Sequence, residues 1–284
     1  MKILVLGANG MLGNVVFRFF SNSPGYEVYG SVRTSAALNL LPDNFIKNIT
    51  SDIDVGDPDR LMYLFNKVKP NIVINCIGLV KQLARADDPL IAIPMNSVLP
   101  HRIERLCEIF NARFIHISTD CVFSGKKGMY IESDIPDAND LYGCSKFLGE
   151  VKGKDSITLR TSIIGHELIG CHSLIDWFLS QSGSVSGYSR AVFSGLPTVE
   201  LARIIRDNVI PLPDLFGLYH VSAEPINKYE LLREVAKIYQ KNIEIYRDDN
   251  LDIDRSLDST RFRNATGYHP ETWPTLIRAM YNFR

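Results

Sequence analysis

The segment 114–150 brings together hydroxyl, phenol and amine groups with a spacing that suits proton transfer. Tyr142 and Lys146 stand four residues apart, which on a helix places both groups on one face, one turn apart. The apolar run 114–118 has the pattern of a buried strand, and it ends in hydroxyl residues. A hydroxyl at the end of a strand, opposite a Tyr/Lys pair on the next helix, is an arrangement for proton transfer. Its cofactor and substrate depend on the elements around it.

The N-terminal glycine loop has the properties that a dinucleotide requires. It follows a strand-like run at 2–6 and precedes a helical apolar pattern at 14–20. Glycines between a first strand and a first helix permit a tight turn and a close approach of the pyrophosphate, which the free N–H groups of the helix then bind. We therefore predict cofactor contacts from Gly7, Asn9, Gly10, Met11, Leu12 and Gly13.

The end of the second predicted strand, at 26–32, favours NADPH over NADH. Sites that select NADH usually have an acidic residue there for the ribose 2′-hydroxyl, and this strand ends without one. Ser31 and Arg33 can instead hold a 2′-phosphate, for which a guanidinium is well suited. The alternative is that Arg33 is an ordinary exposed loop residue.

Further cofactor contacts are expected at the ends of two later strands, predicted at 44–49 and 71–76. Asp57 followed by Pro58 marks a helix start, with Asp as the cap and Pro at the first helical position. The loop before it is expected beside the adenine, although it can also be a plain helix-start loop. The predicted contacts are Asp54 and Val55 for the adenine, and Cys76, Ile77 and Gly78 for the ribose on the nicotinamide side.

The order of the elements predicts an α/β protein with a doubly wound parallel (Rossmann) sheet and a second, smaller substrate-binding domain. Strands and helices alternate through the first half, including a helix at 96–112 that opens at Asn96. The pattern changes after residue 164. We predict a dinucleotide-binding domain at 1–164, to which 190–222 returns, and a substrate-binding domain made of 165–189 and 223–284.

Composition and charge limit the classes of partner and compartment. The 284 residues carry a net charge of −1 without a basic cluster, so nothing points to nucleic acid or an anionic membrane. The five cysteines are widely spaced and form no CxxC pair, which favours reduced thiols and gives no metal site. The apolar run before Gly7 is too short for a signal peptide or a membrane span. We therefore expect a cytoplasmic enzyme.

Several motifs together resemble the extended short-chain dehydrogenase/reductases. They are the loop GANGMLG, the triplet 118–120 (Ser-Thr-Asp) and the segment 142–146 (Tyr-Gly-Cys-Ser-Lys). The closer resemblance is to dTDP-4-dehydrorhamnose reductases, which also have an Arg-Thr-Ser strand like 160–162. The segment 255–259 reads Arg-Ser-Leu-Asp-Ser, where that family more often has Arg-Pro-Leu-Asn-Ser. The resemblance spans nearly the whole chain and is strongest in 1–165.

The resemblance implies a role for each catalytic residue. Tyr142 would donate a proton to the substrate carbonyl as hydride arrives from NADPH, and Thr119 would orient that carbonyl. Lys146 would hold the nicotinamide ribose and lower the pKa of Tyr142 from its ordinary value of about 10. Asn96 resembles the asparagine of the family's proton relay, or it is only a helix cap.

The activity that the resemblance implies is NADPH-dependent reduction of the 4-keto group of a nucleotide-linked 4-keto-6-deoxy sugar, for surface polysaccharide synthesis. Lys81, in a loop at the end of a central strand, would meet an anionic group of the substrate or be a solvated lysine. The family often forms homodimers, and the sequence does not distinguish a homodimer from a monomer. The substrate contacts predicted are Lys81, Thr119, Asp120, Cys121, Tyr142, Arg160, Thr161, His166, Thr198 and Arg255.

Cys121 is the main departure from the family pattern and leaves two alternatives open. Rhamnose-type reductases usually have Tyr there, and sugar-nucleotide dehydratases usually have the Glu that removes water. GDP-fucose synthases, which epimerise before they reduce, place a Cys two residues after the catalytic hydroxyl and a His further on, as Cys121 and His172 would be here. A thiol and an imidazole can exchange protons beside a ketone, but Cys121 can also be a small buried residue. A third alternative is an NADP-binding regulatory protein without catalysis.

Overall fold

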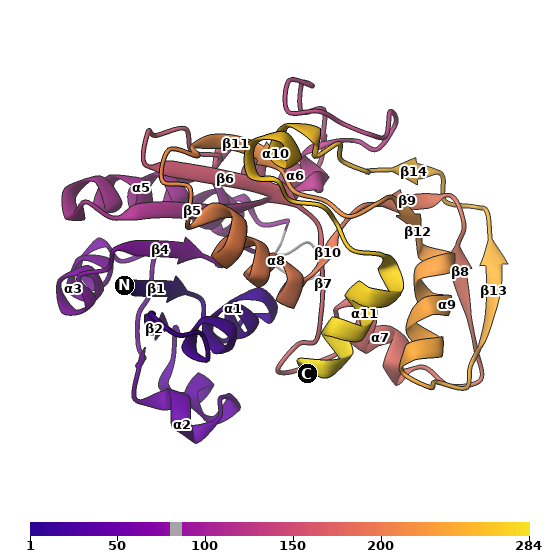
Figure 1. The fold of residues 1–284 in the computed structure, drawn as a ribbon, viewed down its shortest axis with the longest axis horizontal. Helices are drawn as coiled ribbons and strands as arrows, with labels where there is room; N and C mark the ends of the chain where they lie inside the picture. Colours follow the sequence, from indigo (N-terminus) through magenta and orange to yellow (C-terminus); the bar gives the residue numbers. More distant parts are fainter. Residues whose placement is uncertain (80–86) are drawn as a thin grey trace.

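A seven-stranded parallel sheet forms the centre of the computed structural model, which describes residues 1–79 and 87–284 (Figure 1). The strand order is β11-β6-β5-β4-β1-β2-β3, and every neighbouring pair is parallel. This order reverses between β1 and β4, as in doubly wound sheets, so the predicted fold class is confirmed. The strands are β1 (Lys2–Leu6), β2 (Glu27–Ser31), β3 (Ile49–Thr50), β4 (Ile72–Asn75), β5 (Arg113–Thr119), β6 (Ser156–Thr161) and β11 (Gly217–His220).

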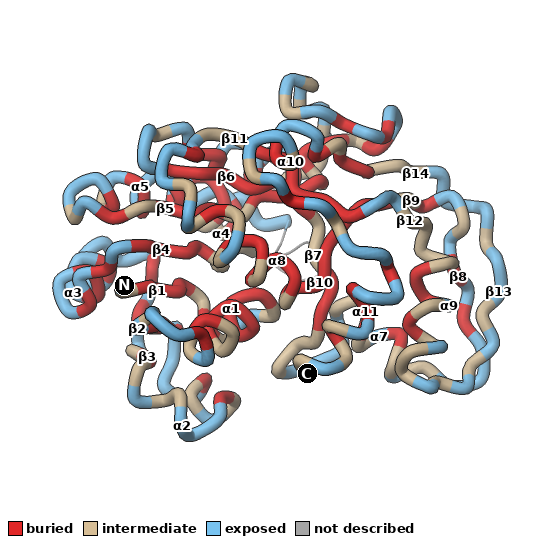
Figure 2. The backbone as a smooth tube through the Cα atoms, in the orientation of Figure 1, coloured by how far each residue is buried: buried red, intermediate tan, exposed pale blue. Residues whose placement is uncertain are grey.

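Helices cover both faces of this sheet because successive strand side chains point to opposite sides. In β1, Ile3 and Val5 belong to a core shared with helices α1 (Met11–Ser21) and α8 (Thr198–Ile204). Leu4 and Leu6 belong to a second core, on the side of α3 (Pro58–Val68) and α5 (Leu99–Phe110). The central strands are buried almost throughout (Figure 2). This double burial explains the uninterrupted apolar runs in their sequences.

The second half of the chain adds three small sheets and four helices beside the main sheet (Figure 1). The sheets pair β7 (Ile163–Ile164) with β10 (Leu196–Pro197), β8 (Ser184–Tyr188) with β13 (Glu244–Asp248), and β9 (Ala191–Phe193) with β12 (Ile226–Asn227) and β14 (Ile253–Asp254). The helices are α7 (Leu174–Ser180), α9 (Lys228–Ile238), α10 (Thr260–Thr266) and α11 (Trp273–Asn282). Strand β11 lies within the predicted return segment 190–222, whereas the domain limits themselves remain a prediction.

Two predicted elements are wrong. The strand expected at 44–49 is mostly helix α2 (Asp43–Ile46), whose Phe45 ring packs edge-on against Phe17. The helix expected to open at Asn96 begins earlier, at α4 (Pro89–Ala92), where the Asp88 side chain accepts a bond from the backbone N–H of Leu90. The helix therefore runs on through the π-helical turn η2 (Ile93–Val98) into α5. The Asp-Pro pair at 88–89 is the same start signal as at 57–58.

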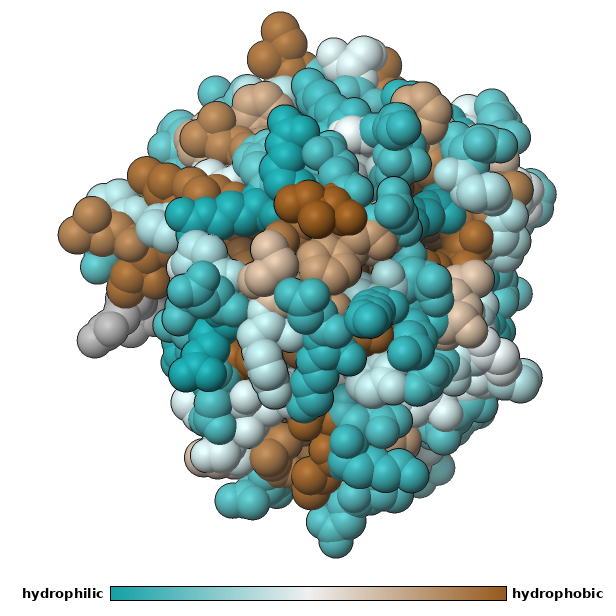
Figure 3. All heavy atoms as spheres, turned by 90° about the vertical axis from the view of Figure 1, so that its left-hand side faces the viewer, coloured by the Kyte–Doolittle hydropathy of each residue, from teal (hydrophilic) through white to brown (hydrophobic). Residues whose placement is uncertain are grey.

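Several short elements and one further helix connect the main strands and helices. The short elements are η1 (Ser35–Leu40), η3 (Asp120–Val122), η4 (Ile205–Val209) and helix α6 (Leu141–Leu148). The predicted cap Asp57 is confirmed at the start of α3, and Asn227 caps α9 in the same way. The left-hand face of Figure 1 is mainly hydrophilic, with several separate groups of apolar side chains (Figure 3). Within 1–79 and 87–284, no helix is long and apolar enough to cross a membrane.

Candidate active site

A cavity of about 680 Å³ opens where the central parallel strands end. The carboxyl ends of β4 and β5 contribute to its lining, together with the glycine loop, the segment 161–174 and two residues from the last third of the chain. Ligands of open α/β sheets bind at this edge. The sequence-predicted residues that line the cavity are Asn9, Gly10, Met11, Leu12, Cys76, Ile77, Gly78, Thr119, Asp120, Cys121, Tyr142, Lys146, Thr161, His172 and Arg255.

The glycine loop forms a cradle that fits a dinucleotide pyrophosphate. Gly7 has a φ of +81°, which favours glycine, and a Cβ on Gly13 would lie 2.0 Å from the Gly7 carbonyl oxygen. A side chain at either position would therefore close the turn that leads into α1. The first turn of α1 carries no acidic residue that would compete with an anion for its N–H groups. Loop and cavity together fit the cofactor predicted from the sequence.

Thr119 ends β5 at the floor of the cavity, where the chain turns sharply. Its Oγ1 accepts a hydrogen bond from the Cys121 backbone N–H at 3.1 Å and lies 3.2 Å from Asp120 Oδ1. Helix α6 packs directly on this turn because Gly143 has no side chain. A Cβ at Gly143 would lie 2.4 Å from the Cys121 carbonyl oxygen. This contact places Tyr142 against Thr119.

The surroundings of Tyr142 favour the protonated phenol. Burial and the nearby Cys121 raise its pKa above the ordinary value, although a hydrogen bond with Thr119 acts in the opposite direction. The predicted lowering of this pKa by Lys146 is therefore not observed. The Lys146 ammonium instead donates to the Ile117 carbonyl at 2.8 Å. A protonated phenol beside a hydroxyl is suited to donate a proton.

Lys146 is almost completely buried, with 5% of its surface exposed. Burial lowers the pKa of its ammonium to about 8, and the Glu150 carboxylate opposes that shift. The side chain nevertheless reaches the cavity beside Gly78, where a Cβ would lie 3.7 Å from Lys146 Nζ. Its charge at the site therefore depends on pH close to the physiological range.

Asn96 connects the loop after β4 to helix α6 and does not line the cavity. Its Oδ1 accepts from the Leu79 backbone N–H at 2.9 Å, and its Nδ2 donates to the Leu79 carbonyl and to Ser145 Oγ. These bonds hold the loop after β4 against α6. The cap alternative is wrong because Asn96 lies inside the helical run, and its amide is already engaged by protein groups.

Arg160 does not contact the cavity, so the predicted substrate contact is wrong. Its guanidinium donates to both oxygens of Glu150 at 2.6 and 2.7 Å and lies 3.3 Å from His220 Nε2. Side chains alternate along β6, so Thr161 faces the cavity while Arg160 points to the other side of the sheet. Arg160 and Glu150 form a buried ion pair that ties β6 to the end of α6.

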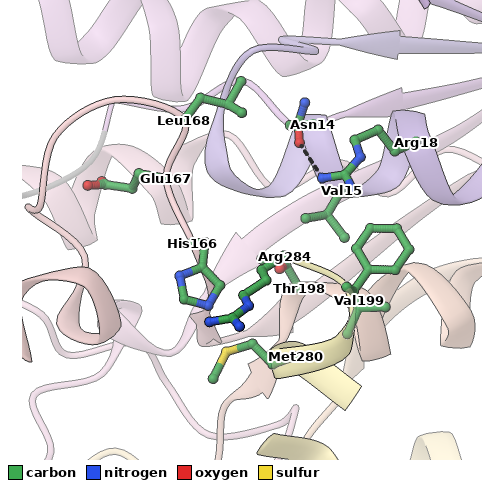
Figure 4. Close-up of a pocket in the computed structure, with 11 residues that line it drawn as sticks. Asn14, Val15, Arg18, His166, Glu167, Leu168, Thr198, Val199, Met280 and Arg284 are labelled. Carbon is green, nitrogen blue, oxygen red and sulfur yellow. Dashed lines mark hydrogen bonds between the residues drawn. The ribbon is translucent and has the colours of Figure 1, made fainter. Parts of the chain in front are cut away.

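His166 and Thr198 lie at a separate cavity of about 110 Å³, shown in Figure 4. The two His166 nitrogens are 2.6 Å from Asp176 Oδ1 and 2.8 Å from the Tyr239 hydroxyl. Both residues follow strands whose ends curve away from the main cavity toward α1 and α11. The structure therefore corrects their assignment as substrate contacts.

The contacts predicted for the adenine end of the cofactor do not line the main cavity. Ser31 and Val55 are buried, whereas Arg33 and Asp54 are exposed. Asp54 accepts a hydrogen bond from the Gly56 backbone N–H, as expected for the helix-start alternative. Lys81 lies outside the described residues.

Lys228 lines the cavity and was not identified from the sequence. It is the first residue of α9, immediately after the cap Asn227. Burial lowers its pKa to about 8, and the nearby Asp120 carboxylate opposes that shift. A cation in the first turn of a helix opposes the helix dipole, and this unfavourable placement was the signal available in the sequence.

The family described as the RmlD substrate binding domain matches residues 1–282. The chain belongs to this family.

The chain is similar to proteins that are named as reductases. The chain is 25% identical to the dTDP-4-dehydrorhamnose reductase of Aggregatibacter actinomycetemcomitans, over 100% of this chain and 98% of that protein. It is 31% identical to the probable low-salt glycan biosynthesis reductase Agl14 of Haloferax volcanii, over 58% of this chain but only 54% of that protein. A dTDP-4-dehydrorhamnose reductase structure from Bacillus anthracis, in complex with NADP, has a TM-score of 0.80 at 18% identity, covering 99% and 98% of the two chains. At 18% identity, this structural similarity shows that the two chains share a fold.

Proposed function

We propose that this protein uses NADPH to reduce the 4-keto group of a nucleotide-linked 4-keto-6-deoxy sugar, for surface polysaccharide synthesis. The observation that carries the proposal is that Thr119, Tyr142 and Lys146 line the same cavity as the glycine loop. The family and the full-length dTDP-4-dehydrorhamnose reductase relative support the choice of substrate.

Some residues of the cavity would bind the substrate and cofactor, and others would transfer a proton. Bound NADPH supplies hydride to the carbonyl carbon. Thr119 orients the carbonyl oxygen, and Tyr142 delivers its phenolic proton to that oxygen, so that an alcohol forms. Lys146, which lines the same cavity, would hold the nicotinamide ribose of the bound cofactor.

The direct test is turnover with a panel of substrates. Purified protein is incubated with NADPH and dTDP-, UDP-, GDP- and CDP-linked 4-keto-6-deoxy sugars, NADPH absorbance is followed, and products are assigned by NMR. The Tyr142→Phe variant should lose about 10²- to 10⁴-fold in kcat because it lacks the proton, with NADP⁺ affinity nearly unchanged. Protein that binds NADPH but oxidises none of it with the whole panel would support the regulatory alternative instead.

The surroundings of Cys121 do not favour the epimerase alternative. Cys121 and His172 both line the cavity, but burial and the Asp120 carboxylate raise the pKa of the Cys121 thiol to about 12. A thiol in this state is a poor base at neutral pH. We expect Cys121→Ser to retain most of the reductase activity, with no solvent deuterium at C3 or C5 of the product. Deuterium incorporation that Cys121→Ser abolishes would restore the alternative.

The preference for NADPH is proposed to depend on Arg33. The side chain is exposed at the end of β2, where a guanidinium can meet a 2′-phosphate. Arg33→Ala should raise KM for NADPH about tenfold or more, since a charge-assisted hydrogen bond is worth roughly 1.5–3 kcal/mol, and leave KM for NADH unchanged. Equal efficiency with both cofactors in the unmodified protein would contradict this.

We also propose a homodimer, formed through exposed apolar residues of α4, η2 and α6. Leu90, Ile93, Phe147 and Leu148 are exposed there, Leu148 by 60%. Light scattering after size exclusion should show twice the chain mass, and Leu148→Glu should reduce it to one chain. Ile135→Glu, at an exposed loop position, is the matched control.

A further inference from the structure

The segment 165–173 forms a thin wall between the two cavities described above. Its residues Glu167 and Leu168 line both the main cavity and the smaller cavity of about 110 Å³ (Figure 4). Three further residues of the segment line the main cavity: Ile169, His172 and Ser173. Because the wall has a cavity on either side, side-chain packing alone supports it poorly.

The middle of this segment is little buried. Ile169 is 65% exposed, and residues 170–172 are exposed as well. Glu167 Oε2 accepts a hydrogen bond from the His172 backbone N–H at 2.8 Å, which braces the segment across its middle. A segment with few buried contacts opens easily unless specific hydrogen bonds hold it closed.

The Asp176 carboxylate, in the first turn of α7, supplies such bonds at both ends of the segment. Its Oδ2 accepts from the Glu167 backbone N–H at 2.6 Å and lies 3.2 Å from Ser173 Oγ. Its Oδ1 lies 2.6 Å from His166 Nδ1. A single carboxylate therefore joins the beginning of the segment to its end.

His166 connects Asp176 to the body of the second half of the chain. Its Nε2 lies 2.8 Å from the hydroxyl of Tyr239, at the end of α9. Burial raises the pKa of Tyr239 above its ordinary value, so the hydroxyl stays protonated and can donate to Nε2, while Nδ1–H donates to Asp176. The Tyr239 ring in turn packs edge-on against Tyr281 of α11. The hydrogen bonds thus fix the wall to α9 and α11.

We propose that Asp176, held by His166 and Tyr239, is a positioning residue that keeps the segment 165–173 in the shape that binds the keto-sugar substrate. A preformed wall raises the affinity because the substrate does not have to order it on binding. The identity of the ligand as a keto sugar rests on the proposed function, whereas the order of the segment can be measured in the free protein.

Hydrogen exchange followed by mass spectrometry measures this order without any ligand. In Asp176→Ala, peptides that cover 165–173 should exchange about tenfold faster or more, because the Glu167 amide loses its acceptor. Peptides from the central sheet should be unchanged. Asp59→Ala is the matched control, since Asp59 also lies in the first turn of a helix, α3, and is exposed.

Steady-state kinetics with a keto sugar from the panel then measures the effect on substrate binding. Asp176→Ala should raise KM for the keto sugar about tenfold, with kcat changed less than about threefold, as expected if the wall has the binding shape for about a tenth of the time. Asp176→Asn keeps one acceptor oxygen for the Glu167 amide and should raise KM less. Asp59→Ala should behave like the unmodified protein.

A purely structural role for Asp176 gives a different result, in which Tm and the amount of active enzyme fall while KM stays the same. Unchanged exchange of 165–173 in folded Asp176→Ala, or an unchanged KM despite faster exchange, would overturn the proposal. Asp176→Asn supplies the same test if Asp176→Ala does not fold. Faster exchange in the variant, together with no turnover of any keto sugar by the unmodified protein, would refute the proposed function and leave Asp176 as the residue that positions the wall.

Discussion

The reaction rate is expected to depend on pH through the charge of Lys146. An amine carries its charge below its pKa and loses it above, and burial places the pKa of Lys146 at about 8. We propose that the ammonium holds the nicotinamide ribose of the bound cofactor, so its loss should slow hydride transfer by misplacing the cofactor.

We therefore predict that kcat, at saturating substrate and NADPH, falls as pH rises through about 8. Lys146→Arg keeps its charge across this range, and its residual activity should lack this fall. Lys228 also has a pKa of about 8, so Lys228→Arg is the control, and it should retain the fall in kcat. A pH profile of kcat that is flat up to pH 10 in the unmodified protein would contradict this assignment.

Arg160 illustrates how a residue of a recognisable motif can serve the fold. Its ion pair with Glu150 is fully buried, and Glu150 also accepts from Ser118 Oγ at 2.8 Å. The pair therefore joins the end of α6 to β6 and, through Ser118, to β5.

We expect Arg160→Ala to lower the free energy of unfolding by roughly 3–5 kcal/mol, because it leaves a buried carboxylate unpaired. Urea denaturation followed by circular dichroism measures this loss. Arg233→Ala removes an exposed pair with Glu230 on α9 and should leave the denaturation midpoint nearly unchanged. Similar midpoints for the two variants would show that the buried pair contributes little.

At the scale of elements, the join between β1 and α1 depends on the absence of a side chain at Gly13. A Cβ there would lie 2.0 Å from a backbone oxygen, whereas a Cβ on Gly10 would be 3.4 Å from its nearest neighbour. Gly10 also has a φ of −79°, which alanine readily adopts.

Gly13→Ala is therefore expected to destabilise the protein without cofactor, and Gly10→Ala is its matched control. Overpacking costs about 1–3 kcal/mol or more, which should lower Tm by roughly 5 °C in a chain of this size. Gly10→Ala should leave Tm within about 1 °C of the unmodified protein. Differential scanning fluorimetry measures both, and equal Tm values would contradict the contact.

At the scale of the whole molecule, one hydrophobic core runs from the sheet into the second half of the chain. It contains Val5 and Phe17 as well as Leu201, Leu231 and Ile277. The dinucleotide-binding half therefore shares much of its core with the proposed substrate-binding half.

Residues 1–164 expressed alone should not fold, even though they match the predicted dinucleotide-binding domain. They lack β11, which pairs with β6, and α8, which covers the same face as α1. The full chain should unfold in one calorimetric transition. Two separate transitions, or dispersed NMR signals from the fragment, would show that the halves fold independently.

The sequence by itself determined the features that depend on neighbouring residues. The strand–helix alternation, the glycine loop, the caps Asp57 and Asn227, and the pairing of Tyr142 with Lys146 all follow from local spacing. These features are readable because periodicity and capping act within a few residues of the chain. They were sufficient to predict the fold class and the main reacting groups.

Only the tertiary structure decided which motif residues face the cavity and which distant residues join them. Arg255 meets Cys121 across 134 positions in sequence, and Lys228 reaches the same wall from α9. Arg160 and Thr161 are adjacent yet face opposite sides of the sheet. Such contacts depend on how the two halves pack against each other. Local sequence patterns do not predict that packing.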